Sequence, residues 1–140
     1  MKILVAVDGS RYTKRMLGYL TAHDELLGNR HAYTMLTIVA PLPGRALTVL
    51  DKEAVANYYQ EEAEKVFKPI RTFLARQGIE ASYASRVGNA SELIARHATA
   101  GKFELLLMGS HGYGNLSGLV MGSVATKVLA HCKTPLLLVR

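Results

Sequence analysis

The sequence has one cysteine, four prolines and no long apolar run. Cys132 cannot form an intrachain disulfide, and no second cysteine or close histidine pair offers the spacing of a metal site. Outside the N-terminal run, the longest apolar stretches, 105–108 and 136–139, fall far short of the roughly 20 residues that span a bilayer. The apolar run that follows Met1 and Lys2 is too short for a signal peptide and lacks a cleavage region. We therefore expect a cytoplasmic protein that needs no disulfide and no structural metal.

The length and charge of the chain limit its number of domains and the class of its partners. The chain has 140 residues, of which 49% are hydrophobic, and it carries 17 Lys+Arg against 11 Asp+Glu, a formal charge of +6. This size predicts one domain over residues 1–140 with a sizeable core. The positive charge fits an anionic partner or simple solubility. Because most cations fall on predicted helices and no nucleic-acid motif accompanies them, we predict neither a nucleic-acid nor a membrane partner.

Short apolar runs alternate with segments of helical periodicity along the whole chain. The runs predict strands at 2–7, 32–40, 79–87, 103–108 and 136–139. The periodic segments predict four helices, three of them capped by Ser10, Asp51 and Asn89 and the fourth over 124–132. Pro69 should kink or divide the long second helix, and Gly78 should end it. Residues 41–50 are expected to form a long loop.

This alternation predicts the α/β class, with one doubly wound, Rossmann-like parallel sheet and helices on both faces. Right-handed crossovers and a flavodoxin-like strand order of 3-2-1-4-5 would put the first and fourth strands side by side. Ligands of such sheets bind beyond the carboxyl ends of the strands, where the order reverses. We expect the functional site between the loops that follow Val7 and Met108.

The segment 109–123, between the fourth strand and the last helix, is rich in glycine. Its glycines, at 109, 112, 114, 118 and 122, let backbone N–H groups converge on an anion, and the helix that begins near Ser123 adds the positive end of its dipole. A glycine-rich turn is more often only a turn. Its position at the expected crevice favours a phosphate site.

Three motifs resemble those of the universal stress protein family. The spacing Gly109-x2-Gly112-x9-Gly122-Ser123 resembles the nucleotide-binding signature of its ATP-binding members. Residues 3–10 look like the family's first strand and acidic turn, and residues 134–139 look like its last strand. The resemblance covers essentially the whole chain.

The resemblance implies a site for ATP, or for ADP or AMP, with Mg²⁺ bound through the phosphates. The acidic residue in the nucleotide pocket would be Asp8, whose carboxylate can accept ribose hydroxyls or reach Mg²⁺. The strand-end residue that meets adenine would be Ile38 or Val39. The phosphates and ribose would lie against the glycine motif and its neighbours: Gly109, Ser110, His111, Gly112, Gly122, Ser123 and Val124.

The chain departs from the family pattern in its cations. Many members carry a basic residue directly after the second glycine of the motif or a few residues later, where this chain has Tyr113, Ser117 and Gly118. More of the phosphate binding then falls to backbone donors, and the preference among ATP, ADP and AMP stays open. Arg11 and Lys127 could compensate, although long cations on helices are usually solvated. His111 could touch a phosphate or lie in solvent.

Other nucleotide-binding and catalytic motifs are absent from the sequence. It has no Walker A loop, no dinucleotide fingerprint after the first strand and no Ser-His-Asp or Cys-His arrangement that fits one site. Without an evident base for water, ATP hydrolysis should be slow at most. Two hypotheses remain: an ATP-binding regulator, or a nucleotide-independent interaction protein in which the glycine loop is structural. In both, the apolar edge strand 136–139 predicts a homodimer.

Overall fold

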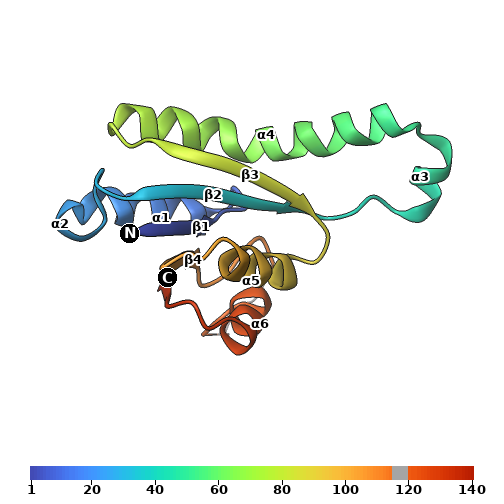
Figure 1. Cartoon of the computed structure of the whole chain (residues 1–140). Helices are drawn as coiled ribbons and strands as arrows, with labels where there is room; N and C mark the ends of the chain where they lie inside the picture. The colour runs from blue at the N-terminus through green and yellow to red at the C-terminus, as the bar shows by residue number, and fades with distance from the viewer. Residues whose placement is uncertain (115–119) are drawn as a thin grey trace.

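One five-stranded parallel sheet organises the molecule in the computed structural model, which describes residues 1–114 and 120–140 (Figure 1). The strand order is β3-β2-β1-β4-β5, which confirms the predicted order and fold class. The elements in chain order are β1 (Lys2–Ala6), α1 (Arg11–Ala22), α2 (Asp24–Leu27), β2 (Ala32–Val39), α3 (Gly44–Val49), α4 (Lys52–Arg76), β3 (Ala81–Val87), α5 (Ala90–Ala100), β4 (Leu105–Gly109), α6 (Ser123–His131) and β5 (Leu136–Val139).

The two faces of the sheet have separate hydrophobic cores. Alternate β1 residues point to opposite faces, so Ile3 and Val5 join one core and Leu4 the other. The first core contains buried residues of α1 and α4, and the second contains buried residues of α5 and α6. Figure 1 shows α4 on one side of the sheet and α5 and α6 on the other. Ile3, Leu4 and Val5 of β1 are all fully buried, as expected for a strand covered on both faces.

Side-chain caps start three of the helices where the sequence predicts them. The Ser10 hydroxyl accepts from the Tyr12 N–H at 3.3 Å, the Asp51 carboxylate from Ala54 at 2.7 Å and the Asn89 side chain from Glu92 at 3.1 Å. Each cap satisfies an N–H group that has no partner within the helix. The Ser10 and Asn89 caps also fix where α1 and α5 begin, next to the carboxyl ends of β1 and β3.

One local expectation, that Pro69 kinks or divides the long helix, was wrong as to the division, and a second was wrong altogether. Helix α4 is not divided at Pro69 but runs as one element of 25 residues. Pro69 is exposed, while Phe67, Ile70 and Leu74 are buried against the sheet, so packing on both sides of the proline outweighs its lost hydrogen bond. The second wrong expectation is the long loop 41–50, because most of it forms α3.

Helix α3 and the start of α4 extend beyond the sheet in Figure 1. Together, α2 and α3 bring the number of helices in the described residues to six, where the sequence predicted four. Both additional helices are short, and short helices lack the repeated periodicity that a sequence pattern needs. Within residues 1–114 and 120–140, no helix has the length and apolar character needed to cross a membrane.

Candidate functional site

A pocket of about 300 Å³ opens between the carboxyl ends of β1 and β4. This is the position at which the strand order reverses, because β1 pairs with β2 on one side and with β4 on the other. Ligands of doubly wound sheets bind at this position. The loops that follow β1 and β4 and the first residues of α5 and α6 line the pocket.

The turn after β1 holds Asp8 at the pocket wall. One carboxylate oxygen of Asp8, Oδ1, accepts from the Ser10 N–H at 2.8 Å and from the Thr13 hydroxyl at 3.0 Å. The Thr13 hydroxyl in turn accepts from the N–H groups of Asp8 and Gly9 at 3.1 and 3.2 Å. Gly9 has a φ of +80°, a conformation that favours glycine and lets the chain reverse here. These contacts fix the Asp8 carboxylate before any ligand arrives.

The glycine-rich loop packs closely against that turn. A Cβ at Gly112 would lie 2.7 Å from Oδ2 of Asp8, so only glycine brings the loop this near the carboxylate. A Cβ at Gly9 would lie 3.2 Å from the Tyr113 hydroxyl, so the tip of Tyr113 rests against the same turn. The two loops predicted to face each other across the crevice therefore do so.

Backbone hydrogen bonds close the glycine loop at its base. Ser110 is buried, and its N–H donates to the Val139 carbonyl at 2.9 Å. The Ser110 carbonyl accepts from the Gly122 N–H at 2.6 Å, which joins the start of the loop to its end. The Gly122 N–H is thus used within the chain, and the amides of Ser123 and Val124 remain as the first N–H groups of α6 at the pocket.

Helix α6 begins at the pocket without a side-chain cap. Gly122 occupies the capping position and supplies no side-chain hydrogen bond. The first N–H groups of a helix lack partners within the helix and carry the positive end of its dipole. Ser123 and Val124, at this helix start, both line the pocket. This end of the pocket can bind an anion.

The pocket also has an apolar lining, which we call its floor. Its floor is formed by side chains from β1, β2, β4, α5 and α6: Ala6, Leu36, Ile38, Met108, Ala90, Ile94 and Ala125. Apolar surface of this kind can bury a flat ring, while the loops carry the polar groups. The pocket is suited to a ligand that has both a flat apolar ring and an anionic group.

Sequence reasoning missed Tyr12, which also lines the pocket. Its ring centroid lies 5.2 Å from that of His111, with the planes inclined at 36°. The His111 Nδ1 atom lies 2.9 Å from the Ser110 hydroxyl. A Cβ at Gly109 would lie 2.6 Å from the Tyr12 Cβ, so this glycine allows α1 to approach β4. That close approach depends on the fold, and the sequence carried no signal for it.

The structure brings nine of the ten predicted site residues to the pocket: Asp8, Ile38, Gly109, Ser110, His111, Gly112, Gly122, Ser123 and Val124. Val39 is not among the lining residues, because its side chain packs against the core on the α4 side. Its carbonyl accepts from the Gly88 N–H at 3.1 Å. Leu36 and Ile38 share the pocket face by the two-residue period of a strand, and this period favours Ile38 over Val39.

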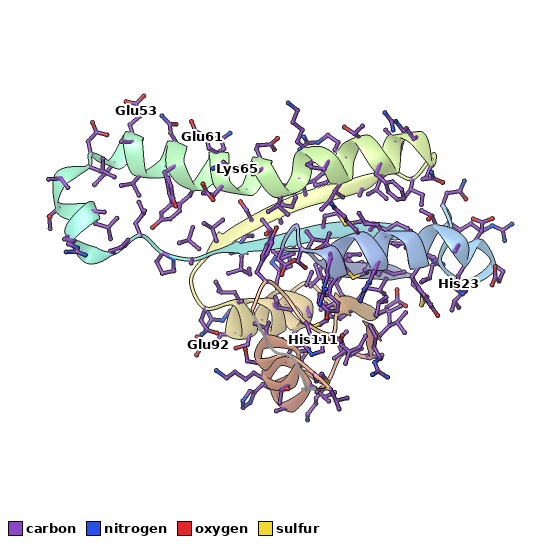
Figure 2. All side chains as sticks on the ribbon, turned by 180° about the vertical axis from the view of Figure 1, so that it is seen from behind. His23, Glu53, Glu61, Lys65, Glu92 and His111 are labelled. Carbon is purple, nitrogen blue, oxygen red and sulfur yellow. The ribbon has the colours of Figure 1, made fainter. Side chains whose placement is uncertain are left out.

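The remaining candidates lie elsewhere. Lys127 is exposed on α6 and does not line the pocket. Figure 2 shows His111 near α5 and α6, and His23 at the far end of α1. Ser117 and Gly118 lie outside the described residues. Among residues 1–114 and 120–140, no three His, Cys, Asp or Glu side chains form a group that could hold a metal ion.

Comparison with known sequences gives one family. The model of the universal stress protein family matches residues 1–140. The "Universal stress protein in QAH/OAS sulfhydrylase 3'region" of Thermus aquaticus is 33% identical over 143 aligned positions, which cover 99% of this chain and 97% of that protein.

Solved structures have the same fold. The hypothetical protein MJ0577 of Methanocaldococcus jannaschii superposes with a TM-score of 0.79 at 26% identity, covering 99% of this chain and 94% of that chain. A universal stress protein from Archaeoglobus fulgidus in complex with dAMP gives a TM-score of 0.69 at 20% identity, covering 100% and 98% of the two chains. The second likeness concerns the fold alone.

Proposed function

The chain belongs to the universal stress protein family, and from this premise we propose that it binds an adenine nucleotide, ATP in the first instance, in the pocket between β1 and β4. One observation carries the proposal: a single pocket combines an apolar floor with a glycine-rich loop and an uncapped helix start. Adenine suits the floor, and phosphate suits the amides of the loop and of α6. The dAMP complex of the Archaeoglobus fulgidus relative supports the choice of ligand.

Each part of the nucleotide has a residue suited to it. The backbone at Ile38 can read the adenine edge, and the Asp8 carboxylate can accept ribose hydroxyls. The N–H groups of Gly112, Ser123 and Val124 are suited to the phosphates. The Gly122 N–H is excluded from this role, because it already donates to Ser110.

Mg²⁺ would enter with the phosphates. This ion keeps several waters and usually takes one or two carboxylates together with phosphate oxygens. Asp8 supplies a carboxylate among the described lining residues, and its Oδ1 is already held by Ser10 and Thr13. The donor set therefore fits Mg²⁺ bound through a nucleotide, with Asp8 as its protein ligand as the alternative to accepting the ribose hydroxyls, and bound Mg²⁺ would neutralise phosphate charge.

We further propose a cytoplasmic regulatory protein that works as a homodimer and hydrolyses ATP slowly at most. The single domain of residues 1–140 would report its nucleotide state to a partner. Strand β5 lies at the sheet edge, and antiparallel pairing with a second copy would use its free hydrogen-bonding groups. His111 is the one histidine among the described lining residues.

A second candidate is a nucleotide-independent interaction protein. The observation that favours it is the hydrogen bond from Gly122 to Ser110, which gives part of the glycine motif a purely structural use. In that case the loop would serve to join β4 to α6, and the pocket would bind no nucleotide.

Isothermal titration calorimetry with Mg-ATP separates the two candidates. We expect saturable binding that Ala90→Leu weakens by about tenfold or more, because the longer side chain occupies the apolar floor. Ala100→Leu is the matched control, since it makes the same change at the exposed far end of α5. No heat with millimolar ATP, or equal binding by both variants, would contradict ATP binding in this pocket.

A further inference from the structure

Helix α1 carries its cations at the pocket end. Arg11, Lys14 and Arg15 are all exposed in its first two turns, and the helix contains no acidic residue. Arg11 and Arg15 flank the ring of Tyr12, with their Cζ atoms 5.2 and 5.3 Å from its centroid. Arg11 Nη2 also donates to the Tyr12 hydroxyl at 3.4 Å.

Tyr12 connects these two arginines to the pocket. Its ring lines the pocket and lies 5.2 Å from the ring of His111 in the glycine-rich loop. Arg11 and Arg15 do not themselves line the pocket, but both guanidinium groups contact the face of a ring that does. Lys14 lies on the same helix but has no recorded contact with a described lining residue.

This arrangement is unfavourable when the pocket is empty. Arg11 and Arg15 are like charges at i and i+4, and they lie at the positive end of the helix dipole. In the part of the chain that the structure describes, ion pairs are recorded only on α4, between Lys65 and Glu62 and between Arg71 and Glu64. The two α1 arginines thus have no recorded carboxylate partner there. Local conflicts of this kind are typical of binding sites.

We propose that Arg11 and Arg15 bind the outer phosphates of a nucleoside polyphosphate and make the site prefer ATP and ADP over AMP. This inference rests on the proposed nucleotide site. Phosphates that extend past His111 towards Tyr12 would meet two guanidinium groups, which bind phosphate through paired N–H donors. The cation that the glycine-rich loop lacks after Gly112 is then supplied from α1.

Binding constants for AMP, ADP and ATP test the proposal. We expect the double variant Arg11→Gln, Arg15→Gln to bind ATP about tenfold or more weakly while its affinity for AMP changes by less than about twofold. Lys14→Gln removes one positive charge from the same helix and should leave the ratio of ATP to AMP affinity unchanged. Equal weakening for AMP and ATP, or an equal effect of Lys14→Gln, would overturn the proposal.

Thermal unfolding gives an independent readout. Without ligand, the double variant should unfold at about the same temperature as the wild type, because the repulsion that it removes is offset by the contacts with the Tyr12 ring that it loses. With ATP, its gain in unfolding temperature should be smaller than that of the wild type, since bound ligand stabilises in proportion to its affinity. A gain with ATP as large as that of the wild type would contradict the inference.

The outcomes distinguish a failure of this inference from a failure of the proposed function on which it rests. If the wild type binds neither AMP nor ATP, the proposed function fails and the inference fails with it. If the wild type binds both and the double variant keeps the same ratio of affinities, only the assignment of Arg11 and Arg15 is wrong.

Discussion

At the scale of single residues, the site depends on a few polar contacts made before any ligand binds. Thr13 is the centre of these contacts: it is 4% exposed, and its hydroxyl accepts two backbone N–H groups and donates to Asp8. A carboxylate held in this way loses little freedom on binding. Preorganisation of this kind favours affinity.

Replacing Thr13 by valine should destabilise the protein by about 1–3 kcal/mol, because the change leaves buried hydrogen-bonding groups without a partner. Urea unfolding followed by circular dichroism measures the change. Thr13→Ser keeps the hydroxyl and should cost clearly less. If Thr13→Val keeps the stability of the wild type, the hydrogen bonds of the Thr13 hydroxyl do not stabilise the turn.

The second prediction at this scale concerns Gly112. In Gly112→Ala, the added Cβ would lie 2.7 Å from Asp8 Oδ2 and would force the loop and the carboxylate apart. We expect the dissociation constant for ATP to rise by about tenfold or more, measured by calorimetry. Gly44→Ala is the control, because an added Cβ there meets nothing within 4 Å. Unchanged affinity in Gly112→Ala would show that the close approach is dispensable.

At the scale of elements, helix starts position the site. The Ser10 cap sets α1 against the Asp8 turn, and the uncapped start of α6 faces the pocket. An element with no part in the site, α4, shows the opposite behaviour, because its burial overrides a proline in its interior. Packing decides the course of α4, whereas local hydrogen bonds decide the form of the site.

Replacing Pro69 by alanine should therefore stabilise the protein, by about 1–3 kcal/mol, because alanine restores a helix hydrogen bond and removes a steric clash. The gain is reduced by the greater freedom of the unfolded chain. Pro135→Ala, just before β5, is a control for the loss of a proline outside a helix. A fall in the urea midpoint of Pro69→Ala would show that α4 uses the proline geometry.

At the scale of the whole molecule, the sheet explains why a sequence of this kind predicts so much of its site. Strand order and alternation bring Asp8 and Gly112 together, and both can be inferred from the pattern of elements. The choice of Ile38 over Val39 required the side-chain direction on β2. The sequence singled out Arg11 but not Tyr12 or Arg15, because the close packing of α1 on β4 depends on space around Gly109 and leaves no local pattern.

A further prediction concerns assembly through the edge of the sheet. The carbonyls of Pro135 and Val139 accept from β4, so by alternation the N–H of Leu138 faces the free edge. In a dimer paired along β5, Leu138→Pro should remove an intermolecular hydrogen bond and give a monomer. Leu138→Ala loses similar packing, keeps the N–H and should remain a dimer. Light scattering after size exclusion measures both, and a monomeric wild type or a dimeric Leu138→Pro would contradict this interface.

The most direct test of the account is an NMR titration of the ¹⁵N-labelled protein with Mg-ATP. Nucleotide bound in the pocket should shift the amide signals of Gly112, Ser123, Val124 and Ile38, while those of α3 and the far end of α4 stay in place. No shifts at millimolar ATP, or shifts confined to residues outside the pocket, would contradict nucleotide binding between β1 and β4.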